Sequence, residues 1–532
     1  MRPLLVAAGM AALCLSTTAS GQTEPAPAQS PAPIESGALR ALDAWTVGAL
    51  ARNQGGLPPA LWAGSDPAFL GVLFDRLPAT FESPAALALA RRALASAGDA
   101  PVGDGRDEAA RKRYAALGRL GMADELATMA AGAASADAAI AQYAAQAELA
   151  RGRIQPACQR SRADGVGEPT PFLLRLRAFC AAAAGEAASA DLALEVARSA
   201  NAEDAWFRSA IGAIAAPPPR PIAARYESSL NASVSLAARL APGAAPLTNA
   251  SALALVTVAR NEAAPAALRA QAAGLAFRRA ILPLAAARAA LRGGEAPAAS
   301  LPALGQAVRQ AEAAPGSLAA ATAIAGALNG SANYMAFFAV ARLFHDDIAA
   351  LTAAPDAAGA LAFTRAAIAT GDMPLGARLA DNAAQAGVEP RLLASAHAAL
   401  AVGQRLNAEG AALAVGRRID AAGPNARAAA RDVTILSALG FPIDGAARAF
   451  LTANPPQGGR RVESGLLAAA QSAAQGRSIG ETALIAAIAA AGGAGGLDAD
   501  SLAALIRALR TAELDDAARG LAIEALNAGP PA

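Results

Sequence analysis

Apolar residues recur along this chain at the spacing of an amphipathic helix and not in the alternation of a strand. In "IAQYAAQAELARGRIQPACQR" (140–160), alanines fall at i, i+3, i+4 and i+7, which places them on one helical face. Strand-forming valine, isoleucine, tyrosine and tryptophan are sparse and never alternate over a useful length. The pattern predicts an all-α protein.

A unit of two apolar helices joined by a short turn recurs along the chain. It occurs around Gly152, Gly185 and Gly371, and residues 505–526 repeat it without the glycine. These pieces resemble tetratricopeptide-like helical hairpins, in which small residues let two helices approach closely. The roughly 34-residue period and the Trp, Tyr and Pro landmarks of that family are missing. The resemblance implies an irregular α-solenoid of antiparallel helical hairpins, a superhelix whose neighbouring pairs bury each other's apolar faces and leave a concave surface.

Proline- and glycine-rich segments at 98–107, 216–221 and 453–460 interrupt the helical pattern. They predict the following regions: a signal peptide at 1–21, a Pro/Ala-rich linker at 22–37, an N-terminal helical region at 38–97, helical hairpin repeats at 107–215, a central helical array at 223–455 and a C-terminal helical cap at 460–532. A helix is expected to begin at Ala38, because Leu39, Leu42, Trp45 and Val47–Leu50 fall largely on one face.

The first residues, "MRPLLVAAGMAALCLSTTASGQ", have the layout of a secretion signal. Arg2 precedes an apolar run from Leu4 to Leu15, and small residues follow it. This layout predicts cleavage near Gly21 and a periplasmic or secreted protein. The alternative is a lipoprotein acylated at Cys14, although Leu13 stands where that motif has Gly, Ala or Ser.

The mature chain is not expected to span a membrane. The apolar run of the signal is shorter than the ~20 residues of a spanning helix. Residues 313–340 carry no charge, but Pro315, Gly316 and Asn329 interrupt them. We expect two buried helices in this stretch.

Two cysteines, Cys158 and Cys180, remain in the mature chain. In an exported protein such a pair predicts one disulfide, here between two helices separated by the turn-rich "DGVGEPTP". The alternative is a pair of buried free thiols. Metal binding is not expected, because nothing nearby supplies further ligands.

Charge and motifs exclude several classes of function. The chain has 45 basic and 43 acidic residues, so no net field would recruit nucleic acid or anionic lipid. The glycine-rich stretch 489–500 lacks the lysine and Ser/Thr of a phosphate loop. His345 adjoins Asp346 and Asp347, but adjacent helical residues point in different directions and cannot chelate one ion together. No cofactor is expected.

The strongest catalytic hint is Glu463. Glu463-Ser464-Gly465-Leu466, followed by Ala470 and Ser472, resembles the opening of the lytic transglycosylase motif. The resemblance implies that Glu463 is a general acid that cleaves peptidoglycan. The later Gly-Leu-Met-Gln segment and the downstream tyrosine of that family have no counterpart, since the last tyrosine is Tyr334. The alternative is a solvated glutamate at the start of a helix.

The segment "LDAWTVGALARNQGGLPPALWAGSDPAFLGVLFDRLP" offers the best candidate binding surface. Aromatic and polar residues on turns suit a protein interface, and we assign the site to Trp45, Arg52, Asn53, Gln54 and Trp62. The alternative is that both tryptophans fill the core. The segment resembles secreted alanine-rich proteins of alphaproteobacteria, some of which bear the label antifreeze glycopeptide. Antifreeze glycopeptides repeat Ala-Ala-Thr, whereas Thr322 in "AAATAIAG" is isolated, so we reject that function.

Taken together, these features predict an exported, non-catalytic helical-repeat scaffold that contacts an envelope protein or a cell-wall polymer. A peptidoglycan-cleaving enzyme that uses Glu463 is the alternative.

Overall fold

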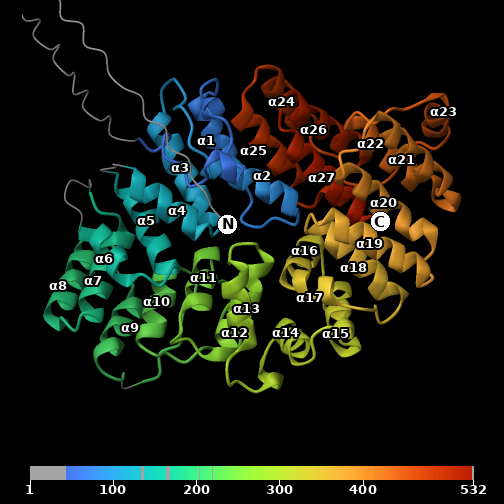
Figure 1. Ribbon diagram of the computed structural model, residues 1–532. Coiled ribbons are helices and arrows are strands. Elements are labelled where there is room, and N and C mark those ends of the chain that lie inside the picture. Colours follow the sequence, from blue (N-terminus) through green and yellow to red (C-terminus); the bar gives the residue numbers. More distant parts are fainter. Residues whose placement is uncertain (1–42, 134–136, 163–167, 203, 219, 530–532) are drawn as a thin grey trace, which may run out of the picture. The chain divides into compact units, whose positions relative to one another are not determined.

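The computed structural model describes residues 43–133, 137–162, 168–202, 204–218 and 220–529 (Figure 1). The predicted signal peptide at 1–21, the linker at 22–37 and the alternative lipid anchor at Cys14 lie outside these residues.

The prediction of an all-α protein is confirmed. The described residues form 27 α-helices and five short 3₁₀ helices, and their only β pairing is three isolated bridges. The α-helices of the first half are α1 (Pro67–Arg76), α2 (Pro84–Ala95), α3 (Arg106–Arg119), α4 (Ala123–Gly132), α5 (Ala138–Ala150), α6 (Ile154–Arg162), α7 (Pro171–Ala183), α8 (Ala187–Ser199), α9 (Ala205–Ala215), α10 (Ser229–Ala237), α11 (Ala252–Arg260), α12 (Ala266–Arg278) and α13 (Leu284–Arg292). Those of the second half are α14 (Ala303–Ala313), α15 (Leu318–Asn329), α16 (Tyr334–Leu343), α17 (His345–Ala350), α18 (Ala357–Ala369), α19 (Met373–Gln385), α20 (Pro390–Gly403), α21 (Ala408–Asp420), α22 (Ala426–Ala438), α23 (Gly445–Ala453), α24 (Ser464–Gln475), α25 (Ile479–Ala490), α26 (Ala499–Thr511) and α27 (Asp515–Ala528). The 3₁₀ helices are η1 (Arg52–Gln54), η2 (Pro59–Leu61), η3 (Ala298–Ser300), η4 (Gly423–Asn425) and η5 (Ala494–Gly496).

The recurring helix–turn–helix units are present where the glycines indicated them. Gly152, Gly185 and Gly371 each have a positive φ, of 74°, 79° and 84°, and they separate α5 from α6, α7 from α8 and α18 from α19. Such turns need the left-handed conformation, which glycine adopts without a steric cost. In the last unit Glu513 takes this conformation with φ 60°. Consecutive helices pack on one another in all four units.

The prediction of a helix that begins at Ala38 is wrong for residues 43–50, the part of this segment that the structure describes. Residues 43–50 form a turn followed by extended chain. The Asp43 carboxylate accepts hydrogen bonds from the backbone N–H groups of Trp45 and Thr46, both at 2.9 Å, and Leu50 forms a bridge with Ser96. An aspartate that bonds the backbone just after it favours a turn over a helix, and the apolar periodicity does not reveal this competition.

The uncharged stretch 313–340 forms the two expected helices, α15 and α16, separated by a turn at 330–333. Phe337 and Phe344 are buried. Within the described residues, no helix is both long and apolar enough to cross a membrane.

The last helices of the chain pack against the first ones. Both α25 and α27 contact α2, and α25 also contacts α1. Figure 1 shows the blue N-terminal helices beside the red C-terminal ones. The approach is close: a Cβ atom on Gly480 of α25 would lie 2.3 Å from the Trp62 ring. Any larger residue at this position would therefore push the two ends of the chain apart.

A buried carboxylate joins the two ends. Glu524 of α27 accepts hydrogen bonds from the Ser83 hydroxyl at 2.7 Å and from the Ala85 N–H at 3.0 Å. Its second oxygen accepts one from the Ala494 N–H at 2.8 Å. Since Ser83 caps α2 and Ala494 begins η5, the carboxylate satisfies backbone donors at two helix starts. Burial nevertheless raises the pKa of Glu524 to about 7.

Arginine side chains cap the carboxyl ends of neighbouring helices. They donate to carbonyl oxygens in or just beyond the last turn of a helix other than their own, where no intrahelical N–H is available. The pairs are Arg119 with Phe74, Arg177 with Ser161, Arg309 with Arg292, Arg365 with Asn527, Arg460 with Ala489 and Arg510 with Ala438. These bonds satisfy carbonyl oxygens at helix ends and tie each end to a neighbouring segment.

The predicted disulfide between Cys158 and Cys180 is present. It links α6 to α7, with a Cα–Cα distance of 5.8 Å. Both cysteines belong to a second, smaller hydrophobic core that includes Phe172, Phe179 and Phe207. The bridge therefore holds together a part of the protein that does not share the main core.

Replacing both cysteines with serine should lower the free energy of unfolding by about 3 kcal/mol, because the bridge restricts the unfolded chain. Urea unfolding followed by circular dichroism measures the change. Reduced wild-type protein serves as the control and should match the Cys158→Ser, Cys180→Ser variant. Equal stability of oxidised and reduced wild-type protein would contradict the expectation.

Glu524 should make stability depend on pH. Its pKa is about 7 in the folded protein and near the ordinary glutamate value of 4.5 in the unfolded chain, so the folded state holds an extra proton between these values. The free energy of unfolding should therefore fall as pH rises from about 4.5 to 7, by up to about 3 kcal/mol. In Glu524→Gln this fall should be absent, whereas the exposed Glu513→Gln should keep it. Parallel pH profiles for wild type and Glu524→Gln would disprove the assignment.

Candidate functional site

The two tryptophans of the predicted binding site lie in the core. Trp45 and Trp62 are 1% and 0% exposed, and their rings meet edge to face at 5.8 Å. Phe74 of α1 completes the cluster. In the described structure the tryptophans expose no surface to a partner. They fill the core, which was the alternative to a binding role.

A buried arginine organises this cluster. The guanidinium of Arg113, from α3, lies over both tryptophan rings at 5.7 and 5.8 Å. It donates to the carbonyl oxygens of Leu94 at 2.8 Å and Ser96 at 2.6 Å, at the end of α2, and to that of Ala44 at 3.1 Å. Burial lowers the pKa of Arg113 to about 10, which leaves it charged at neutral pH.

The three polar residues of the predicted site are placed differently. Arg52, Asn53 and Gln54 form η1 and are exposed. The Gln54 side chain accepts a hydrogen bond from the Ala51 N–H at 3.3 Å. Gln54 also lines a cavity. The sequence therefore predicted one residue at the edge of this cavity, whereas its other walls come from distant segments.

This cavity is a cleft of about 720 Å³. Its walls come from α2, α4, the turn between α12 and α13, and α16, with Gln54 at one edge. The volume falls in the range of small-molecule sites, roughly 300–1,000 Å³. Apolar side chains line much of it: Leu87, Met122, Ile281, Leu282 and Phe338.

Two acidic residues of the cleft wall are already paired. Glu125 forms an ion pair with Arg91, which also lines the cleft. Asp124 binds Arg260 through two hydrogen bonds at 2.8 and 3.2 Å and pairs with Arg151 at 3.2 Å. These contacts lower the pKa of Asp124, chiefly through the Arg260 bond. Each of these carboxylates therefore has an arginine that balances its charge.

Two arginines of the wall have no carboxylate within ion-pair distance among the described residues. Arg92 donates through Nε to the Gly55 carbonyl at 2.7 Å. Arg342 lies over Phe277 and Phe338, at 5.6 Å from each ring centroid. Burial, and secondarily the charge of Arg91, lowers the pKa of Arg342. The cleft thus carries uncompensated positive charge beside apolar walls.

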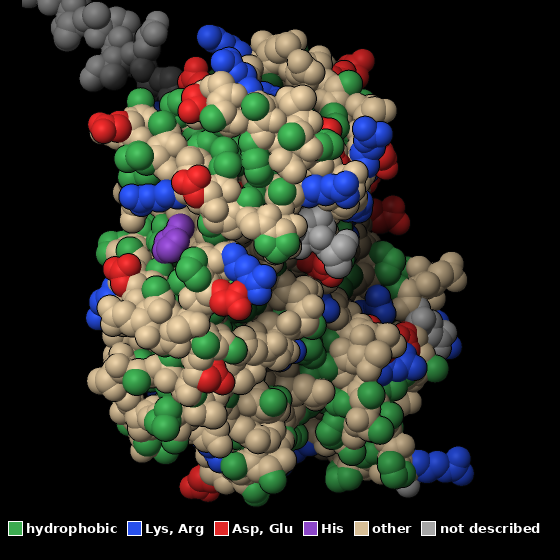
Figure 2. Space-filling view, turned by 90° about the vertical axis from the view of Figure 1, so that its right-hand side faces the viewer, with side chains coloured by type: hydrophobic (Ala, Val, Ile, Leu, Met, Phe, Trp, Pro, Cys, Tyr) green, Lys and Arg blue, Asp and Glu red, His purple; other side chains and the backbone are tan. Residues whose placement is uncertain are grey.

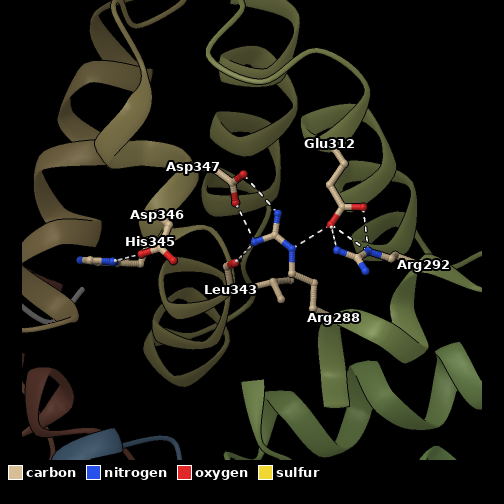
Figure 3. Close-up of polar contacts among 7 residues, drawn as sticks. All are labelled: Arg288, Arg292, Glu312, Leu343, His345, Asp346 and Asp347. Carbon is tan, nitrogen blue, oxygen red and sulfur yellow. Dashed lines mark hydrogen bonds and ion pairs between the residues drawn. The ribbon is translucent and has the colours of Figure 1, made fainter. Parts of the chain in front are cut away.

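The histidine with two adjacent aspartates is part of a structural network (Figure 3). Asp347 binds Arg288 at 3.0 and 3.1 Å, whereas Asp346 accepts from His345 at 2.9 Å, so the two aspartates serve different partners. Arg288 also binds Glu312 at 2.8 Å and thereby links α13, α14 and α17. The bond to Asp346 raises the pKa of His345. In the described part of the chain, no three His, Cys, Asp or Glu side chains could together hold a metal ion.

Glu463 lies immediately before α24 and is 74% exposed. Its one ion-pair partner among the described residues is Arg76, at 3.4 Å. A general acid of a glycosidase works beside an enclosed sugar with a second polar group in place. The surroundings of Glu463 therefore match a solvated residue at a helix start better than a catalytic one.

Comparison with protein-family models, with curated proteins and with solved structures finds no match.

Arg113→Met should destabilise the protein by several kcal/mol, because it leaves buried carbonyl oxygens without donors. The loss should appear as a lower urea midpoint and a shifted tryptophan emission, since Trp45 and Trp62 lose the cation above them. Arg106→Met on the same helix is a suitable control: the Arg106 side chain is 49% exposed, and its one ion pair among the described residues is with Asp107, at 3.8 Å. Equal stability of the two variants would refute the organising role of Arg113.

Proposed function

We propose that this chain is an exported, non-catalytic helical-repeat scaffold that binds an envelope protein or a cell-wall polymer. The observation that carries the proposal is the cleft: walls contributed by distant helices, apolar surface and unpaired positive charge favour binding. In this proposal the consecutive helix pairs form a tetratricopeptide-like solenoid, and the resemblance to secreted alanine-rich proteins of alphaproteobacteria reflects a shared role.

Export is supported by the disulfide between Cys158 and Cys180, because such bonds persist in oxidising compartments and are rare in the cytosol. The predicted signal peptide with cleavage near Gly21 is the proposed route. Acylation at Cys14 is the alternative mode of retention in the envelope.

The charge distribution on the surface favours a partner that carries both positive and negative groups over a polyanion. Figure 2 shows acidic and basic side chains interspersed on one face, and the chain as a whole is close to neutral. A nucleic-acid-binding surface would instead gather positive charge.

The proposal is tested by site-specific photo-crosslinking in the native cell. A crosslinking residue at Asn53, on the exposed η1 beside the cleft, should give a product that one at Ser209 on α9 does not give. Mass spectrometry should identify an envelope protein or glycan strand, and the purified partner should reproduce the product. Products of equal yield at both positions would argue against a partner at this face.

The alternative of a peptidoglycan-cleaving enzyme is tested separately with purified cell wall. Release of muropeptides by the wild-type protein that is lost in Glu463→Gln, and kept in Glu513→Gln, would replace the scaffold proposal. We expect no release from any of the three proteins.

A further inference from the structure

We propose that the cleft binds a monocarboxylate with an apolar body, and that Arg342 is the residue that pairs with its carboxylate. The ligand class is either a peptide ending in an apolar residue or a fatty acid. This inference rests on the proposed binding function and specifies the chemistry of its site.

Arg342 is held ready for an anion. Phe338 lies one turn before it on α16, and Phe277 comes from α12. The two rings hold the guanidinium through cation–π contacts, which fixes its plane without using its N–H donors. A planar guanidinium with free donors binds a carboxylate through two parallel hydrogen bonds. The partial burial of Arg342 strengthens such a pair by reducing screening by water.

The wall charges favour a negatively charged group on the ligand. Arg92 and Arg342 have no carboxylate partner among the described residues, so the wall attracts an anion. Asp124 and Glu125 line the same cleft, but each is already paired with an arginine, so Arg92 and Arg342 remain to attract the ligand. Inorganic phosphate has no apolar body to bury against the walls and is therefore expected to bind weakly.

The rest of the cleft suits an apolar group. Leu87, Met122 and Leu282 are 7%, 5% and 2% exposed, and together with Ile281 they face the cavity. Burying a leucine-sized group on such walls is favourable, at roughly 25 cal/mol per Å². A carboxylate attached to an aliphatic or aromatic body would use both features of the site at once.

Isothermal titration calorimetry on the full chain tests the inference with matched probes. One pair is an acetylated tripeptide ending in leucine, as the free acid and as the amide; the other is decanoate and decanamide. We expect at least one acid to bind and its amide to bind tenfold more weakly or less. Whichever acid binds identifies the source of the ligand, and inorganic phosphate serves as the dianion control.

Variants then assign the role of Arg342. Arg342→Met keeps an aliphatic stem over the two rings and should weaken binding of the acid at least tenfold while leaving binding of the amide unchanged. Arg225→Met removes a guanidinium stacked on Trp206 at 5.0 Å, away from the cleft lining, and should have no effect. Thermal unfolding of both variants checks that the fold is retained.

The inference is overturned if neither acid binds, if acid and amide bind equally, or if Arg342→Met binds the acid as wild type does. Any of these results, combined with a position-dependent crosslink at Asn53, would remove the ligand class and leave the scaffold function standing. Binding of the acid without such a crosslink would support the ligand class and argue against the scaffold function.

Discussion

Alanine makes up about half of the buried hydrophobic residues, and this limits how much each helix contact can stabilise. A buried methyl group contributes under about 1 kcal/mol, whereas a buried leucine or phenylalanine contributes roughly 1.5–3 kcal/mol. Small residues do allow close approach, and the contact between Gly480 of α25 and the Trp62 ring, which leaves no room for a Cβ atom, is the extreme case. The protein therefore combines many close, individually weak helix contacts with a few concentrated clusters: the tryptophans around Arg113, the aromatics of α16 and the core beside the disulfide.

Arginine supplies much of what alanine lacks. Its long stem crosses the gap between helices, and its several N–H donors reach carbonyl oxygens that a helix end leaves unpaired. Lysine has a compact ammonium group and could not bond several carbonyls in one plane, as Arg113 and Arg309 do. This geometry gives a physical reason for a chain in which Lys112 is the only lysine. The same residue type, where no carboxylate pairs with it, makes the cleft positive.

Local features could be predicted from the sequence, whereas contacts between distant segments could not. Helical periodicity, the breaks at 98–107 and 216–221, and the cysteine pair all act within a few tens of residues. The local sequence around Trp45 and Trp62 is the same whether they face a partner or the core. Their burial depends on Arg113 of α3, which is distant in sequence and packs over both rings. Glu524 reads as an ordinary solvated charge in an alanine-rich helix, and only the approach of α2 buries it. Among the residues that line the cleft, Gln54 was identified from the sequence, whereas no motif or pattern in the sequence pointed to Arg342.

The bond between Ser83 and Glu524 joins residues 441 positions apart, and this separation has a consequence for how the chain matures. Chains are made from the amino end, and early segments generally fold first. Here, however, α2 packs against α25 and α27, which are synthesised much later, and Trp62 packs against α25. Contacts of such long range also form slowly. A newly made chain would thus expose the apolar face of α2 until α25 and α27 have been synthesised, and this face could contact other unfolded chains in the meantime.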